Sequence, residues 1–439
     1  VMAEQASGQG VLARYFRLAE HGTDVRTELL AGATTFVTMA YIIFVNPQMM
    51  AAAGMDQQAS FVATCLASAI ACLIMGLYAN WPVGLAPGMG LNAFFTYTVV
   101  ADMGYSWEVA LGAVFLAGVL FVIMSVTRIR RWMLDSIPMD MRIAMGAGVG
   151  LFVGFIGLKS GGVIVASDAT FLTLGDLTRP EPFLACIGFL LIAVLSIRQV
   201  HGGIIIGILT VTVLALLQGL VAFDGLVSAP PSLSPILFKL DIAGALDVAM
   251  TSVIIAFLFV NLFDTAGTLL GVASRAGLVD KDGNIENMDR ALKADSTSSV
   301  LGAFLGCAPV TSYVESASGV AAGGRTGLTA VTVGGLFLLA IFFAPLAGMV
   351  PAYATAGALV YVAMLMLTGV QGLEWSDMSE VVPALITIVM IPLSFSIANG
   401  IAVGFISYVA IKLCIGRVGE ITPGAWFLAI IFLAKFAFM

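Results

Sequence analysis

Long apolar runs follow one another along almost the whole chain, and short polar or charged stretches separate them. Most runs are about 17 to 25 residues long, the length that an α-helix needs to cross a bilayer. They predict two sets of seven segments. The first set is expected near 29–51, 60–79, 83–101, 108–127, 141–160, 182–198 and 202–223. The second set is expected near 248–273, 296–307, 309–323, 327–350, 353–370, 380–397 and 399–415.

Composition excludes the soluble globular class. Hydrophobic residues make up 60% of the chain and charged residues only 10%, and the mean hydropathy is +1.05. The expected fold class is therefore an all-α polytopic membrane protein. The five Cys lie singly in apolar runs and the two His lie near segment ends, so no metal site, cofactor or disulfide frame is expected. The net charge of −7 is spread over loops, and no nucleic-acid partner is expected.

The distribution of Lys and Arg orients the segments. With the N-terminus in the cytoplasm, fifteen of the 19 fall on the cytoplasmic side and only Lys159, Arg179 and Lys239 on the outer side, leaving out Lys435 in the tail. An odd number of segments before Thr251 turns the second set upside down relative to the first. Residues 1–28 are expected to form a cytoplasmic N-terminal segment. Residues 416–439 form an apolar tail, which either spans the membrane or lies in its interface.

Two acidic residues stand inside apolar segments. Asp264 lies within 251–273 and Glu315 within 306–324. A carboxylate at the centre of a bilayer costs roughly 3 kcal/mol or more, and such residues usually mark a substrate or ion pathway. The pair therefore indicates a transport protein with a polar site in the membrane, and structural ion pairing is the alternative explanation.

Three short matches between the two sets indicate an inverted seven-plus-seven repeat. AYIIFVNP in the first segment resembles AFLFVNLFD in the eighth, and HGGIIIGI in the seventh resembles ANGIAVGF in the fourteenth. The third match pairs LAPGMGLNAF in the third segment with CAPVTSYVES in the tenth. Short segments interrupted by Gly and Pro at corresponding positions of two halves point to a transporter's binding site.

The third and tenth segments are expected to be broken helices. Pro87 and Pro309 lack an N–H and restrict the residue before them, so an extended stretch is expected before each. A helix that restarts beyond the break presents unpaired N–H groups and the positive end of its dipole. Asn92 and Glu315 follow the two breaks and Asp264 comes from a neighbouring helix, so one small polar pocket is expected between them.

Several stretches resemble the azaguanine-resistance-like purine permeases of the nucleobase–cation symporter-2, or nucleobase–ascorbate transporter, family. They are GATTFVTMAYIIFVNP, GLAPGMGLNAFF, FVNLFDTAGTLLGVA, ADSTSSVLGAFLG and TSYVESASGVAAGGRTGLTAV. TSYVES is also similar to the TTYGEN stretch of the uracil permeases. The resemblance covers nearly the whole chain, from Tyr15 to about Arg417.

The resemblance implies a uracil-permease-like fold of fourteen segments in two domains. The core domain would comprise 29–127 (segments 1–4) and 248–350 (segments 8–11). The gate domain would comprise 128–223 (segments 5–7) and 351–415 (segments 12–14), and would support a homodimer. Family members take up adenine, guanine or hypoxanthine with protons across the bacterial cytoplasmic (inner) membrane. Their binding residues correspond to Asn92, Asp264 and Glu315.

The chemistry of these residues suits a purine, which is a flat neutral ring with N–H donors and N or O acceptors on its edge. A carboxylate accepts two adjacent N–H groups, and Asn92 offers both a donor and an acceptor. Glu315 is assigned to the substrate and Asp264 to proton coupling, although the roles can be reversed or shared because coupled carboxylates titrate together. Helix bridging by Asn92 is the alternative for that residue. Further candidates are Phe94, Phe95, Phe259 and Phe263 for ring stacking, and Thr38, Ser312 and Ser316 for hydroxyl contacts.

Two rival functions are weighed against purine transport. An anion or carboxylate carrier of the same architecture would need a basic or neutral pocket, whereas this one presents two acids. An intramembrane enzyme is not expected, because no nucleophile–base set or metal spacing lies within the segments. For the motion of core against gate, the small residues expected between the domains are Gly146, Gly148, Gly150 and Gly357.

Overall fold

The computed structural model describes residues 10–127, 137–278 and 285–438. Regular structure in these residues is almost entirely helical, as the apolar runs predict. Arg128, Arg130, Arg131 and Lys281, which were counted as cytoplasmic, lie outside the described residues. The helices of the first half are α1 (Val11–Tyr15), α2 (Val25–Met39), α3 (Ile42–Ala52), α4 (Gln57–Ile74), α5 (Met89–Ala93), α6 (Trp107–Val126), α8 (Met139–Ser160), α9 (Pro180–Ile197) and α10 (Gly203–Leu217).

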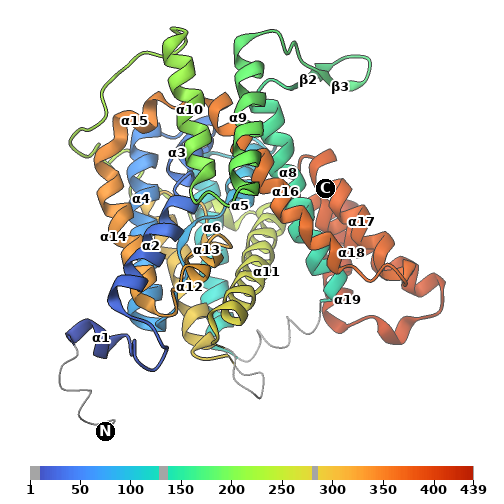
Figure 1. Ribbon diagram of the computed structural model, residues 1–439. Coiled ribbons are helices and arrows are strands. Elements are labelled where there is room, and N and C mark those ends of the chain that lie inside the picture. The colour runs from blue at the N-terminus through green and yellow to red at the C-terminus, as the bar shows by residue number, and fades with distance from the viewer. Residues whose placement is uncertain (1–9, 128–136, 279–284, 439) are drawn as a thin grey trace.

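The second half of the chain is also mainly helical (Figure 1). Its helices are α11 (Met250–Ala276), α12 (Met288–Leu305), α13 (Ser316–Ala321), α14 (Gly327–Ala340), α15 (Ala344–Met349), α16 (Ala352–Leu367), α17 (Met378–Leu393), α18 (Ile397–Cys414) and α19 (Pro423–Phe438). The strands among the described residues are β1 (Leu85–Pro87), β2 (Ile164–Ser167), β3 (Phe171–Leu174) and β4 (Val310–Ser312).

Nine helical stretches in the described part of the chain are long and apolar enough to cross a bilayer. One of them combines α2 and α3, so the first predicted segment bends near Ala40. The apolar tail forms α19, whose 16 residues span about 24 Å as a straight helix. This is shorter than a hydrocarbon core of roughly 30 Å.

Polar side chains fix where several helices begin. Asp24 and Asp56 each accept the backbone N–H three positions further on, at 2.8 and 2.7 Å. Asp377 caps α17 by accepting the hydroxyl of Ser379 at 2.7 Å and its N–H at 2.9 Å, and Arg417 donates to it at 2.8 Å. These bonds, led by the Ser379 hydroxyl, lower the pKa of Asp377 to about 2.

The ninth segment is longer than predicted. The sequence indicated a polar loop up to Asp295 and a helix near 296–307, whereas α12 begins at Met288. Asp295 therefore lies within a helix and is buried. The prediction was wrong because Ser296, Ser298 and Ser299 make this stretch look polar, although their side chains are also buried.

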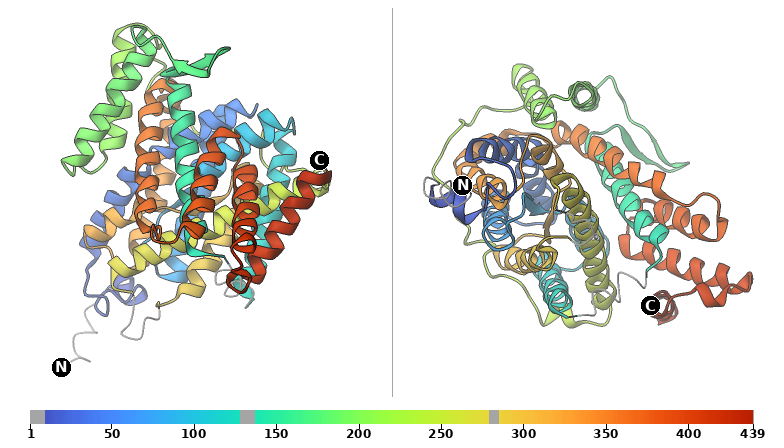
Figure 2. Two further views of the ribbon diagram at one scale, coloured as in Figure 1. Left: turned by 90° about the vertical axis from the view of Figure 1, so that its right-hand side faces the viewer. Right: turned by 60° about the horizontal axis from the view of Figure 1, so that its bottom comes forward.

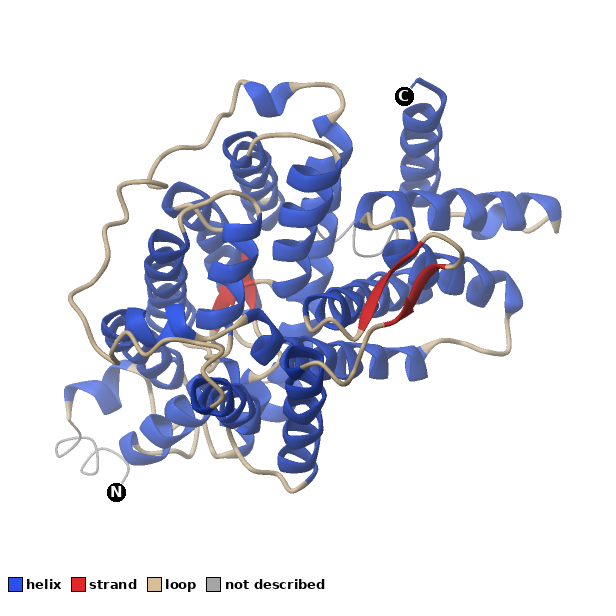
Figure 3. Ribbon diagram, turned by 90° about the horizontal axis from the view of Figure 1, so that it is seen from above, coloured by secondary structure: helices blue, strands red, loops and turns tan. Residues whose placement is uncertain are grey.

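The third and tenth segments are broken, as predicted, and they pair with each other. β1 and β4 form an antiparallel two-stranded sheet among the helices (Figure 3), with Ala86 opposite Thr311. The extended stretch of the tenth segment follows Pro309 rather than preceding it. The short helices α5 and α13 begin shortly after the strands. Beyond the strands the backbone groups have no partner strand, and helix formation lets them bond to one another.

The described helices pack in two groups (Figure 2). The first helix group consists of α2, α3, α4, α6, α12 and α14 with the half-helices α5 and α13. The second helix group consists of α8, α9, α10, α16, α17 and α18. The long helix α11 contacts both groups, since it packs against α6 and α13 and also against α8 and α18.

Candidate functional site

The paired strands hold the starts of the two half-helices together. The Tyr313 hydroxyl donates to the Pro87 carbonyl at 2.6 Å, and the Gly84 N–H donates to Ser316 Oγ at 2.9 Å. Gly88 precedes α5 and Glu315 precedes α13. The paired strands therefore bring the starts of α5 and α13 together, and the first N–H groups of α13 donate to carbonyls of the turn before it, from Tyr313 to Glu315.

Glu315 is the carboxylate at this junction, and its side chain is partly exposed. The buried Tyr41, at the bend between α2 and α3, donates its hydroxyl to Glu315 Oε1 at 2.5 Å. Thr38 and Ser318 share a hydrogen bond of 2.9 Å, which joins α2 to α13. A purine approaching Glu315 thus meets a carboxylate that already has one donor and keeps a second oxygen for the ligand.

Asp264 lies on α11, which packs against α13, β4 and α5. Its side chain is partly exposed, and the next residue, Thr265, donates its hydroxyl to Asp295 at 2.8 Å. Asp264 therefore lies on the helix that binds Asp295 and that packs against the half-helix following Glu315.

Asp295 is the member of this cluster that the sequence interpretation missed. One of its oxygens accepts the Thr265 hydroxyl at 2.8 Å, and the other accepts the N–H and the hydroxyl of Ser312 at 2.8 and 2.6 Å. Asp295, Ser298 and Ser299 stand at helical spacing of three and four, so they share one face of α12. That spacing was the sequence signal that could have predicted Asp295 to lie on a buried face of a helix.

Asn92 is fully buried on α5, and within the described residues neither its amide nitrogen nor its amide oxygen has a partner. An unpaired buried amide costs about 1–3 kcal/mol. A ligand or water at this position would recover that cost. The structure therefore keeps Asn92 among the candidates.

The predicted aromatic candidates differ in their surroundings. Phe94 is fully buried, and its ring packs edge-on against Phe257 with a centroid distance of 4.9 Å. Phe263 is partly exposed and stacks on Phe259 at 6.0 Å. Phe263 thus keeps some accessible surface, whereas Phe94 has none.

The predicted hydroxyl candidates are occupied by protein contacts. Ser312 binds Asp295 and Ser316 accepts the Gly84 N–H, so both hold the backbone of the tenth segment in place. Their present role is to position the carboxylates.

Glu28 is a second buried acid that the sequence interpretation did not single out. Glu28 belongs to the predicted cytoplasmic segment, yet α2 begins at Val25 and the Glu28 side chain is fully buried. Its oxygens accept the N–H groups of Arg325, Thr326 and Thr329, with the Arg325 bond at 2.8 Å. The Thr329 hydroxyl donates to it as well, at 2.6 Å. Glu28 therefore fixes the junction between α13 and α14.

The glycines expected between core and gate pack elsewhere. Added Cβ atoms at Gly148, Gly150 and Gly357 would meet α17, α16 and α9, all within the second helix group, and one at Gly146 would meet nothing within 4 Å. Gly90 on α5 instead approaches α8 so closely that a Cβ would collide with its Val149. One close approach between the two groups is therefore at Gly90.

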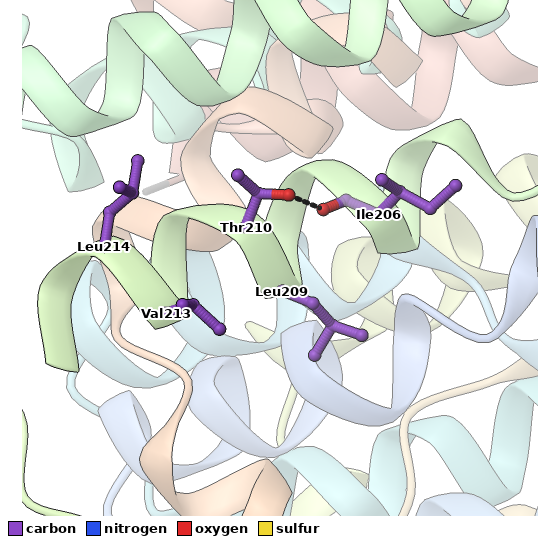
Figure 4. A pocket seen from close by; sticks show the side chains of 5 residues that line it. All are labelled: Ile206, Leu209, Thr210, Val213 and Leu214. Atoms are coloured by element: carbon purple, nitrogen blue, oxygen red, sulfur yellow. Dashed lines mark hydrogen bonds between the residues drawn. The ribbon is translucent and has the colours of Figure 1, made fainter. Parts of the chain in front are cut away.

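An apolar hollow of about 350 Å³ on the surface of α10 lies outside this cluster (Figure 4). It is lined by Ile206, Leu209, Thr210, Val213 and Leu214, and the Thr210 hydroxyl is bonded to the Ile206 carbonyl at 2.7 Å. Its walls offer a lipid chain contact area but no polar group for chemistry.

Comparison with known proteins places this geometry in context. A family described as "Permease family" matches residues 26–403. The adenine permease AdeP of Escherichia coli (strain K12) is 50% identical over 99% of this chain and 98% of its own length. The guanine/hypoxanthine permease PbuG of Bacillus subtilis (strain 168) is 43% identical over 97% of this chain and 99% of its own. The transmembrane domain of the cyanobacterial bicarbonate transporter BicA has the same fold at 15% identity, with a TM-score of 0.65 over 85% of this chain and 96% of that domain.

Proposed function

This chain belongs to the permease family, as an integral membrane transporter rather than an enzyme, and from that premise we propose that it takes up purine nucleobases. The observation that supports the proposal is the junction of the two half-helices, where Asn92 lies on α5, Glu315 lies just before α13, and α11, which carries Asp264, packs against both. The names of AdeP and PbuG support adenine, guanine or hypoxanthine as the substrate.

Glu315 is the proposed substrate carboxylate. Its free oxygen can accept two adjacent N–H groups of a purine edge, and Tyr41 holds the other oxygen. Asn92 would complete the recognition with its unpaired amide. Phe263, which is accessible beside Asp264, is the proposed stacking partner, whereas Phe94 would first have to leave Phe257.

Proton coupling is proposed for Asp264, with Glu315 able to share the role. Asp264 is partly exposed, and the neighbouring Thr265 is bonded to Asp295, so a second carboxyl group lies close to the proposed proton acceptor. Uptake of one proton would lower the repulsion in the cluster and favour the loaded state.

The proposed architecture has fourteen segments in an inverted seven-plus-seven repeat. The first helix group with α11 would form the core domain, and the second helix group the gate domain. The antiparallel pairing of β1 with β4 supports the inversion, since one strand comes from each half. Alternating access would then move the core against the gate around a fixed site.

We also propose a homodimer through the gate domain, in the bacterial cytoplasmic membrane with the N-terminus inside. The charge distribution supports that orientation. The anion or carboxylate carrier is not favoured, because the resemblance to BicA is one of fold alone and the proposed site carries three carboxyl groups.

The test is binding and uptake by purified protein in liposomes, with adenine, guanine, hypoxanthine, uracil and bicarbonate compared. At least one purine should bind, and an inward proton gradient should drive its accumulation. Glu315→Gln should lower purine affinity by about 10- to 150-fold, the loss of one charge-assisted hydrogen bond. The exposed Glu20→Gln is the matched control. Binding of uracil or bicarbonate but of no purine would overturn the proposal.

A further inference from the structure

The outer end of α8 carries a basic residue placed over two aromatic rings. Lys159 Nζ lies 5.3 Å from the ring centroid of Phe395 and 5.9 Å from that of Tyr97. Tyr97 belongs to the helical stretch beyond α5 in the first helix group, and Phe395 lies between α17 and α18 in the second. The Lys159 side chain therefore touches both groups where they meet.

Several further contacts join the two helix groups around Phe395. The Thr98 hydroxyl donates to the Phe395 carbonyl at 2.7 Å, and the Tyr97 and Phe395 rings meet edge-on at 6.2 Å. Phe152 and Phe155 of α8 hold the other sides of the Phe395 ring at 5.2 and 5.5 Å. Phe395 has a φ of +51°, which an aromatic residue rarely adopts, so these contacts fix its backbone in a strained conformation.

A second link joins the two groups at their outer ends. Gln48 of α3 donates its amide to the Val350 carbonyl at 2.8 Å and accepts the Thr355 hydroxyl of α16 at 2.8 Å. By the predicted orientation, Gln48, Thr355, Lys159 and Phe395 all lie on the outer side of the membrane.

The inner end of α8 meets the first group through α11. The Arg142 guanidinium lies 5.9 Å from the ring of Phe263, next to Asp264. Arg142 and Lys159 are separated by about 25 Å along one helix, at a rise of 1.5 Å per residue. Asp264 and Glu315 are both partly exposed. Both carboxylates of the candidate site thus keep some accessible surface while the outer ends of the groups are held together.

We propose that Lys159, Tyr97, Thr98 and Phe395 form the outer gate of the transport path, which must open to admit a purine from outside. The proposal rests on the proposed function. Lys159 is exposed, so its contact with the rings is weak and reversible, as a contact broken in every cycle must be. The rings pack against one another, and the hydrogen bond from Thr98, together with the two that Gln48 makes, joins the outer ends of the groups.

The first experiment locks this gate. Thr98→Cys and Phe395→Cys are combined, oxidised or bridged with a short bifunctional thiol reagent, and compared with each single variant. Uptake should fall at least 10-fold on bridging and return with a reductant. Purine binding to the purified protein should stay within about 3-fold, because the site still opens to the other side. Undiminished uptake by the bridged protein, or loss of binding together with uptake, would overturn the gate.

The second experiment loosens the gate. Ala93→Cys is a buried reporter one turn before Tyr97, placed in a protein without Cys186 and Cys414. Lys159→Met should raise its labelling by a membrane-impermeant maleimide from outside by about 2- to 5-fold, the scale of one exposed cation–π contact. Lys159→Arg should leave labelling unchanged, and equal labelling of the Met and Arg variants would overturn the role of Lys159. Failure of the proposed function would look different, since unmodified protein would then bind no purine.

Discussion

Replacing Glu28 by Gln tests how the half-helix that carries Glu315 is held. Glu28 is fully buried at the start of α2, and its two oxygens accept four donors from the Arg325–Thr329 turn. Gln has nearly the same shape, but one oxygen becomes an NH₂ group. If its remaining oxygen keeps the Arg325 and Thr326 N–H groups, the NH₂ group faces the Thr329 N–H, and two donors then meet.

The magnitude follows from the donors. Leaving the Thr329 N–H unsatisfied costs about 1–3 kcal/mol, and the loss of charge weakens the remaining bonds. We expect a total loss of folding free energy of about 2–4 kcal/mol for Glu28→Gln. Glu28→Ala leaves all four donors without an acceptor and should cost more. Thr329→Val removes the hydroxyl, which is the shortest of these bonds, and should cost less.

The assay is thermal unfolding of purified protein in detergent, with purine affinity measured on the same samples. The melting temperature should fall in the order Glu28→Ala, Glu28→Gln, Thr329→Val, with Ala lowest. Purine affinity should fall with it, since the turn that follows α13 is no longer anchored. The exposed Glu20→Gln serves as the control. If Glu28→Gln has the same melting temperature as that control and binds purine normally, the anchoring role is wrong.

Four further outcomes are expected. Asp264→Asn should keep purine exchange but lose proton-driven accumulation between pH 5 and 8; accumulation against a gradient by this variant would refute the coupling role. Asp295→Ala orphans three buried donors and should cost about 2–5 kcal/mol of folding free energy, more than Asp295→Asn, and equal melting of the two would contradict this. The pKa of Asp377 is lowered to about 2, below an unfolded value of about 3.9, so its stabilisation is complete above about pH 4 and is lost as pH falls toward 2. Asp377→Asn should therefore reduce the fall in melting temperature between about pH 4 and pH 2, and an unchanged fall in that range would disprove this role. Gly90→Ala should slow transport at least 3-fold by overpacking against α8, while Gly146→Ala, which meets open space, should not; similar rates for both would argue against close contact at Gly90.

The helical segments were predictable because the bilayer imposes one requirement on all of them. A segment in hydrocarbon must be apolar along about 20 residues and must satisfy its own backbone hydrogen bonds. The apolar runs therefore marked the helices, and α6, α8 and α11 begin and end within a few residues of their predicted bounds. The breaks at Pro87 and Pro309 were readable for the same reason, since Pro and Gly interrupt a pattern that is otherwise continuous.

The pairing of the two breaks was not readable from the sequence. Three residues of β1 meet three of β4 across more than 200 positions, and no local preference encodes a contact of that separation. The register places Ala86 opposite Thr311, and nothing in the two motifs specifies that partner. The Tyr313 hydroxyl, which donates to the Pro87 carbonyl, and Ser316, which accepts the Gly84 N–H, support this register, and both bonds depend on how α4, α11 and α12 pack around the strands.

The sequence by itself determined the class of protein, the helical segments and the two acids Asp264 and Glu315, because an acid in an apolar run is conspicuous. Only the tertiary structure revealed Asp295 and Glu28 as buried acids. Each stands beside polar residues in the sequence, where a carboxylate is unremarkable, and each is buried because distant N–H and hydroxyl donors converge on it. Burial of a charge depends on its partners in space, and those partners are fixed by the packing of whole helices rather than by neighbouring residues.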